Sequence, residues 1–120
     1  MSRAIYPILR YTDARVAIEF LTTAFGFEVT EVSEGEGGAV VHAELTYGDG
    51  LVMLSRLDDD AAKGRSMVYV AVDDADAHHD QATAAGAEIT QPLTDQPYGS
   101  REYGALDPEG NHWYFGTYSP

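Results

Sequence analysis

The chain has 120 residues, with 20 acidic and 7 basic side chains and a formal net charge of −13 at neutral pH. This charge argues against binding to nucleic acid or to an anionic membrane surface, because both favour lysine and arginine. The chain contains no cysteine, which excludes disulfides and thiolate metal sites.

The first half of the chain predicts the order β-α-β-β-β. Thr12-Asp13 marks a helix start, because either side chain can cap the first turn, and Gly26 ends the helix in the manner of a C-terminal glycine. Glycine-rich turns separate the strands that follow. The expected elements are a strand at 5–11, a helix at about 14–24, and strands at 27–32, 39–47 and 51–57.

A polar linker at 57–65 follows, and then the same pattern starts again. Asp73-Asp74 is suited to cap a second helix, and Gly86 ends it. The expected elements are a strand at 67–72, a helix that ends near 85, strands at 87–90, 98–106 and 111–118, and a loop at 91–97.

The two halves form an internal repeat. Asp13 and Asp74 are 61 positions apart, and Gly26 and Gly86 are 60 positions apart. One β-α-β-β-β unit is too small to close its own sheet, whereas two can pair. We therefore expect an α+β fold in a single domain, 1–120. Two tandem βαβββ modules, at about 4–57 and 66–118, would form a curved eight-stranded mixed sheet around a cleft, with the helices outside.

The segment Asp107-Pro108-Glu109-Gly110-Asn111, followed by Trp113 and Phe115, carries the strongest motif. Proline presets a turn, glycine accepts a positive φ, and the aromatic run favours a strand. This segment resembles the vicinal oxygen chelate superfamily, which contains glyoxalase I, bleomycin-resistance proteins, fosfomycin-resistance enzymes and extradiol dioxygenases. The chain looks closest to the small, single-domain glyoxalase-like and bleomycin-resistance-like members. The resemblance spans essentially the whole chain and implies two modules, one cleft and a homodimer.

Metal-dependent members of that superfamily bind one divalent ion through His, Gln or Glu on the first and last strands of each module. The resemblance carries these positions to Tyr6, Met53, Met67 and Tyr114, with Leu54 in place of Met53 if the register differs by one. Thioether sulfur is soft and a neutral phenol is a poor ligand, so we expect no metal cofactor. The same residues suit an organic ligand. Alternatively, Met53 and Met67 are ordinary core residues.

His42 and Glu44 lie two positions apart on a predicted strand, so they share one face. They are candidates for an acid/base couple or for two metal ligands, with a third ligand from Glu102 or His112 on a facing strand. His112 is also a candidate acid or base by itself. Both members of the pair could instead be ordinary polar residues on a solvated face. The opposite face of the strand, which should pack on a helix, is apolar: Val41, Ala43 and Leu45.

Arg101 alternates in phase with Tyr103 on another predicted strand. One interpretation is that the pair faces the cleft, where an arginine beside a tyrosine can bind a carboxylate. The other is that Arg101 forms an ion pair with a nearby acid such as Glu44.

These patterns favour a binding protein with a metal-free cleft that holds or sequesters a small organic molecule, cationic or aromatic, such as an antibiotic. The acidic charge would favour a cationic ligand. Two alternatives within the same superfamily are a metal-dependent lyase, isomerase or dioxygenase, and a metal-independent acid/base enzyme. The candidate ligand-binding residues are Tyr6, His42, Glu44, Met53, Met67, Arg101, Tyr103 and Tyr114.

No apolar run approaches the roughly 18–20 residues of a membrane helix. The N-terminal segment 1–7 lacks the apolar core of a signal peptide, so we expect a cytoplasmic protein with neither membrane nor nucleic-acid partners.

Overall fold

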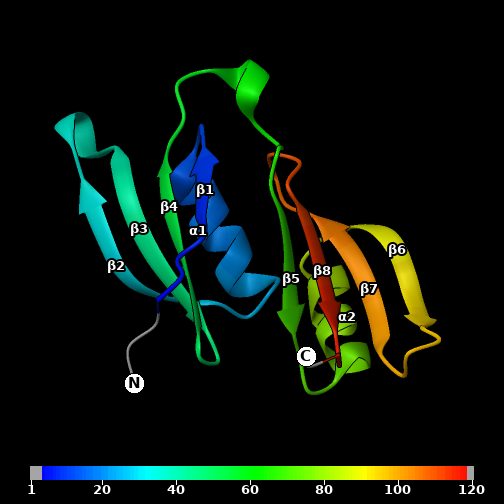
Figure 1. Ribbon diagram of the computed structural model, residues 1–120. Helices are drawn as coiled ribbons and strands as arrows, with labels where there is room; N and C mark the ends of the chain where they lie inside the picture. Colours follow the sequence, from blue (N-terminus) through cyan, green and yellow to red (C-terminus); the bar gives the residue numbers. More distant parts are fainter. Residues whose placement is uncertain (1–3, 119–120) are drawn as a thin grey trace. The chain divides into compact units, whose positions relative to one another are not determined.

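The computed structural model describes residues 4–118. The chain divides into two compact units, with the boundary between Lys63 and Gly64, inside the linker expected at 57–65. Each unit contains one α-helix and one four-stranded sheet (Figure 1). Residues 1–3, part of the segment considered for a signal peptide, lie outside the described residues.

Unit 1 has the β-α-β-β-β order expected from the sequence. Its strands are ordered β1-β4-β3-β2, with β1 parallel to β4 and the other neighbours antiparallel. Short 3-10 turns, η1 and η2, follow β2 and β4. The elements are β1 (Ile8–Tyr11), α1 (Ala14–Thr23), β2 (Glu28–Glu34), η1 (Glu36–Gly38), β3 (Val40–Tyr47), β4 (Gly50–Arg56) and η2 (Asp60–Ala62).

Unit 2 repeats this topology, with strand order β5-β8-β7-β6 and a parallel β5–β8 pair. The predicted α+β class with two βαβββ modules is therefore confirmed, and the eight strands are distributed over two four-stranded mixed sheets. The elements are β5 (Met67–Ala71), α2 (Ala75–Ala84), β6 (Glu88–Asp95), β7 (Arg101–Leu106) and β8 (His112–Gly116).

Both helices begin where the sequence predicts. The carboxylate of Asp13 accepts a hydrogen bond from the Val16 amide at 3.2 Å, and that of Asp74 accepts one from the Ala77 amide at 3.0 Å. Each aspartate satisfies one of the amides that a helix start leaves without a partner. Gly26 and Gly86, which follow the helices, both have positive φ.

The core of each unit lies between its helix and one face of its sheet. In unit 1, alternate residues of β1, β3 and β4 are buried, and Leu21 of α1 is buried with them. In unit 2, Trp113 and Phe115 are fully buried, as alternation predicts, and Tyr103 stacks on Phe115 with ring centroids 5.2 Å apart. The buried strand residues of unit 1 include Leu9, Tyr11, Ala43, Leu45 and Leu54.

The Asp-Pro-Glu-Gly-Asn segment forms the turn into β8. Gly110 has φ of 89°, and Asp107 is buried. One carboxylate oxygen of Asp107 accepts the backbone amides of Glu109 and Asn111, both at 3.0 Å. The other accepts the indole N–H of Trp113 at 3.0 Å. The motif is thus a buried polar network that fixes the turn and holds the tryptophan.

Strand β6 is longer than the sequence suggested. We expected a strand at 87–90 and a loop at 91–97, but the strand runs from Glu88 to Asp95 and includes Pro92. Proline has no amide to donate, and edge strands tolerate it. β6 is the edge of its sheet, and its register with β7 shifts between Gln91 and Thr94, around the proline.

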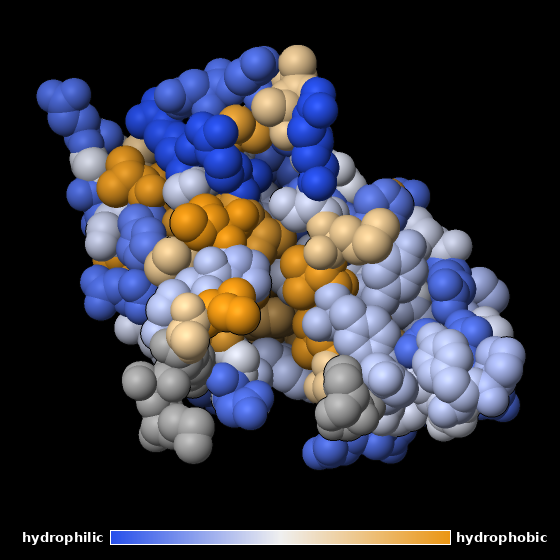
Figure 2. Space-filling model, in the orientation of Figure 1, coloured by the Kyte–Doolittle hydropathy of each residue, from blue (hydrophilic) through white to orange (hydrophobic). Residues whose placement is uncertain are grey.

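Figure 2 shows where hydrophilic side chains gather on one face of the molecule. Hydrophilic side chains gather at the top of the view, over the connection that carries η2 and three consecutive aspartates at 58–60. Among residues 4–118, no helix combines the length and the apolar character that crossing a membrane requires.

Candidate functional site

Each sheet has a second face that its own helix does not cover. In unit 1 this face carries Met53 of β4, which pairs with Ile8 on one side and Glu44 on the other. In unit 2 the corresponding residue is Tyr114 of β8, which pairs with Tyr69 and with Gly104. Most candidate ligand-binding residues lie on these two faces, which we call the open faces of unit 1 and unit 2.

His42 and Glu44 form a direct contact on the open face of unit 1. The imidazole Nε2 lies 3.0 Å from Oε2 of Glu44, and both side chains are about one-third exposed, at 35% and 34%. The predicted common face is confirmed. Ala43 and Leu45 are buried as expected, but Val41 is 39% exposed. That expectation failed because Val41 lies at a register shift. Ser33 pairs with His42 and Glu34 pairs with Val40, so Val41 has no partner residue on β2.

The four residues that the resemblance assigns to metal-binding positions are poor metal ligands. Tyr6 precedes β1 and is 42% exposed, and Met67 at the start of β5 is 71% exposed. With Met53 and Tyr114 they supply two phenols and two thioethers, which suit neither a hard nor a borderline divalent ion. Residues 4–118 also contain no group of three or more His, Cys, Asp or Glu side chains arranged to hold a metal.

Arg101 and Tyr103 both point to the helix side of their sheet. Arg101 Nε donates to Asp76 at 2.6 Å and its Nη1 donates to Asp95 at 3.1 Å, and these hydrogen bonds raise the pKa of the guanidinium above its usual value. The ion-pair interpretation is therefore the one observed, with these two aspartates instead of Glu44. Tyr103 is fully buried, and its hydroxyl lies 2.6 Å from Nδ1 of His78. Tyr103 therefore fills the core and does not line the open face.

A pocket of about 540 Å³ lies at one end of the open face of unit 2. Its walls are tyrosine rings that keep 42–58% of their surface exposed, and Glu102 forms its base with only 7% exposed. The rings of Tyr98 and Tyr118 meet edge to face, with centroids 5.6 Å apart. We call this feature the tyrosine pocket, and its residues are Tyr69, Tyr98, Glu102 and Tyr118.

The carboxylate of Glu102 is held by hydroxyl groups. Oε2 accepts hydrogen bonds from Tyr69 at 2.7 Å and from Ser100 at 3.0 Å, and Oε1 accepts one from Tyr98 at 2.7 Å. Burial raises the pKa of this carboxyl, but the three hydroxyl donors together outweigh burial and lower the pKa below its usual value. Glu102 is therefore ionised at neutral pH.

The same hydrogen bonds raise the pKa of the tyrosines that donate them. The bond to Glu102, followed by burial, raises the pKa of Tyr98 to about 12. The pKa of Tyr69 is also raised, first by burial and then by its contact with Glu102. Both phenols are therefore neutral donors at neutral pH, and the pocket carries one negative charge at its base.

Gly116 makes this arrangement possible. It pairs with Glu102 across β7 and β8, and Tyr69 reaches over it from β5 to the carboxylate. A Cβ at position 116 would lie less than 3.0 Å from both the Tyr69 hydroxyl and Cγ of Glu102. Gly104 does the same for the ring of Tyr114, because a Cβ there would be 2.9 Å from that ring. Two glycines thus leave room for two tyrosines on the open face.

The sequence analysis named Glu102 only as a candidate third metal ligand, and it missed Tyr69, Tyr98 and Tyr118. Two signals were present in the sequence. Tyr69 is two positions after Met67, so alternation places both on one face, and Glu102 must point away from Arg101 and Tyr103. What joins the residues is the register of β7 and β8 and the conformation of the segment before β7, which the sequence pattern does not specify.

His112 also lies toward the open face of unit 2. It pairs with Met67 and with Leu106 on the neighbouring strands. Its Nδ1 is buried and has no hydrogen-bond partner among the described residues. A buried polar atom of this kind is costly unless a partner satisfies it.

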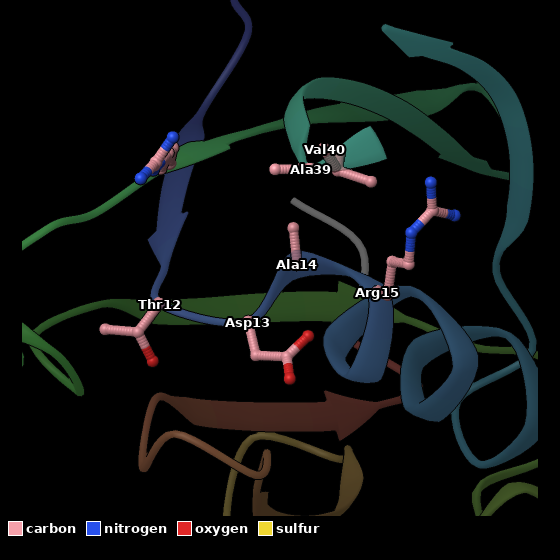
Figure 3. Close-up of a pocket in the computed structure, with 7 residues that line it drawn as sticks. Thr12, Asp13, Ala14, Arg15, Ala39 and Val40 are labelled. Atoms are coloured by element: carbon pink, nitrogen blue, oxygen red, sulfur yellow. The ribbon is translucent and has the colours of Figure 1, made fainter. Parts of the chain in front are cut away.

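A smaller pocket of about 200 Å³ lies in unit 1 at the start of α1 (Figure 3). Two arginines line it, but both are already neutralised. Arg15 contacts the carboxylate of Glu34 and donates to the carbonyl of Gly38 at 2.8 Å, and Arg56 donates to Asp58 at 2.8 Å. This pocket therefore offers little to an anion, and the tyrosine pocket is the stronger candidate site.

Comparisons with known proteins agree with the fold. The family description Glyoxalase/Bleomycin resistance protein/Dioxygenase superfamily matches residues 4–115. An uncharacterized protein of Mycobacterium bovis is 32% identical over 124 residues, which cover 94% of this chain and 82% of that protein.

Two solved structures are similar over nearly the whole length. TioX from Micromonospora sp. ML1 is 36% identical with a TM-score of 0.81, and the match covers 98% of both chains. The bleomycin-binding protein from bleomycin-producing Streptomyces verticillus, complexed with copper(II)-bleomycin, is 25% identical with a TM-score of 0.71. That match covers 96% of this chain and 97% of the other.

Proposed function

The chain belongs to the glyoxalase/bleomycin resistance protein/dioxygenase superfamily, and on this premise we propose that it binds a small organic molecule with an aromatic or cationic part. Binding would use an open sheet face and no metal. The candidate residues on the open faces are Tyr6, His42, Glu44, Met53, Met67, Tyr69, Tyr98, Glu102 and Tyr114.

The tyrosine pocket carries this proposal. Its volume of about 540 Å³ lies inside the roughly 300–1,000 Å³ typical of small-molecule sites. Tyrosine rings offer a large apolar surface, and exposing several of them around one hollow is costly for a surface that binds nothing. The ionised Glu102 at the base supplies the polar group that selects and orients a ligand.

The donor set at the four metal positions supports the metal-free part of the proposal. Phenol and thioether groups there, and no carboxylate or imidazole, fit an organic molecule better than a divalent ion. Similarity to a bleomycin-binding protein points the same way, and we extend the proposal to binding or sequestering an antibiotic.

A second candidate function rests on the His42–Glu44 contact. A carboxylate 3.0 Å from an imidazole fixes the orientation of the ring, and both side chains remain accessible to a substrate. This geometry suits a metal-independent enzyme in which His42 transfers a proton. Such an enzyme would lose turnover in His42→Ala and would keep its turnover in the presence of a chelator.

A thermal-shift panel on untagged protein tests the proposed function. The panel contains neutral aromatic, aromatic cationic and divalent-metal compounds, each with and without EDTA, and elemental mass spectrometry measures the bound metal. We expect organic ligands to raise the melting temperature of the chain equally with and without EDTA. Near-stoichiometric zinc, nickel, manganese or iron that is lost in a His42→Ala/Glu44→Ala variant would refute the proposal.

The homodimer and the cytoplasmic location remain predictions. Light scattering on the purified chain measures the first, and fractionation of cells that express it measures the second.

A further inference from the structure

We propose that the tyrosine pocket binds an alkylated ammonium group, tertiary or quaternary, of its small-molecule ligand. This inference rests on the proposed function and narrows the class of ligand. It follows from three features of the pocket: the arrangement of its rings, the charge at its base and the small number of spare hydrogen-bond acceptors.

The rings provide surfaces that attract a cation. The π-electrons of tyrosine attract a positive charge within about 6 Å of the ring centroid. Tyr98 and Tyr118 stand at an interplanar angle of 82°, so they present differently oriented surfaces to the pocket, and Tyr69 lines it too. Three rings around one hollow suit a rounded group with several alkyl substituents better than a flat one.

Among the residues that the structure describes, the charge of Glu102 has no cationic partner. This carboxylate is 7% exposed, and none of the ion pairs among residues 4–118 includes it. Arg101 is its neighbour in the sequence, but the guanidinium lies on the helix side with Asp76 and Asp95. Hydroxyl groups stabilise the carboxylate without neutralising it. A ligand cation in the pocket would supply the missing positive charge.

The hydrogen bonds to Glu102 favour an alkylated ammonium over a primary ammonium or a guanidinium. Both carboxylate oxygens of Glu102 already accept hydroxyl donors, and the Tyr69 and Tyr98 hydroxyls are turned toward the carboxylate. A primary ammonium or a guanidinium would lose water from several N–H groups and find few acceptors. An alkylated ammonium has one N–H or none, so it can leave water and contact ring carbons while it keeps its charge.

Choline and two relatives of similar size test this inference. The compound 3,3-dimethylbutan-1-ol has the shape of choline but a carbon in place of the charged nitrogen, and ethanolamine has a primary ammonium. NMR titration of each into the intact chain, followed through the tyrosine ring resonances, gives three dissociation constants. We expect choline to bind at least about tenfold more tightly than either relative, as expected for a cation that several rings contact.

Variants locate the binding and separate charge from shape. Glu102→Gln removes the charge, Glu88→Gln is the control on the exposed edge strand of the same unit, and Tyr98→Ala removes one ring that is 58% exposed. We expect Glu102→Gln and Tyr98→Ala each to weaken choline about fivefold or more, and Glu88→Gln to change the dissociation constant less than about twofold. Tyr98→Ala keeps the test decisive if Glu102→Gln fails to fold.

The outcomes distinguish this inference from the proposed function. Equal affinity for choline and its neutral relative would overturn the inference, as would unchanged choline binding in both Glu102→Gln and Tyr98→Ala. The proposed function would survive either result if neutral aromatic compounds of the thermal-shift panel still stabilise the protein. The proposed function would be refuted together with the inference only if no organic compound of the panel stabilises the protein.

Discussion

Replacing Gly116 by alanine tests the packing under the tyrosine pocket. The backbone of Gly116 has no positive φ, so alanine introduces no backbone strain. The new Cβ would lie under 3.0 Å from the Tyr69 hydroxyl and from Cγ of Glu102, so these side chains must separate. Overpacking of this kind costs about 1–3 kcal/mol of unfolding free energy. The Tyr69–Glu102 hydrogen bond would break, and choline binding would weaken with it.

A double-mutant cycle in urea denaturation isolates this clash. In a Tyr69→Phe/Glu102→Ala background, the two closest atoms are absent, so Gly116→Ala should cost nothing. It should even stabilise the chain by about 0.4–1 kcal/mol, as glycine replacement does where the backbone allows it. If Gly116→Ala lowers the unfolding free energy equally in both backgrounds, the clash with Tyr69 and Glu102 is not its cause and the reasoning is refuted.

Three further predictions concern titration and packing. Spectrophotometric titration at 295 nm should show one tyrosine with a pKa near 12, that of Tyr98, and Glu102→Gln should bring this pKa back toward 10; unchanged curves would contradict the assigned hydrogen bond. Because the pKa of Glu102 is lower in the folded than in the unfolded chain, its stabilising contribution should be full above pH 4.5 and fall as pH drops through the folded pKa. Choline binding should fall over the same range, whereas Glu102→Gln should remove this part of the pH dependence, measured by melting temperature. Asp107→Ala leaves the buried indole N–H of Trp113 without its acceptor and should lower the unfolding free energy by about 2–4 kcal/mol. Tyr103→Phe should lower it by about 1–2 kcal/mol and leave choline binding unchanged. A tenfold loss of choline affinity in Tyr103→Phe would contradict its place in the core.

The fold was predictable because local signals agreed with the repeat. The capping aspartates, the glycines after each helix and the 61-residue offset between Asp13 and Asp74 all mark the same module boundaries. The offset also pairs Ile8 with Tyr69 and Met53 with Tyr114, and these residues occupy equivalent strand pairs in the two sheets. Strand alternation also predicted that His42 and Glu44 share one face, because residues two positions apart on a strand point the same way.

The predictions failed where a strand departs from regular pairing. A register shift in the β2–β3 pair exposes Val41, and Pro92 lies inside an edge strand instead of a loop. Alternation put Arg101 and Tyr103 on one face correctly, but it could not say which face the helix covers. The tyrosine pocket depends on a contact across three strands, over Gly116, and no local pattern in the sequence reports such a contact.

The most direct test of the central claim is the melting temperature of the untagged chain in EDTA with increasing benzyltrimethylammonium, which joins an aromatic ring to a quaternary ammonium. The proposed function predicts a rise that follows mass action, equivalent to about 2.7 kcal/mol of added stability when the ligand reaches 100 times its dissociation constant. The Glu102→Gln variant should need more ligand for the same rise. A melting temperature that responds to no organic compound in EDTA, and rises only when a divalent metal is added, would contradict a metal-free organic site.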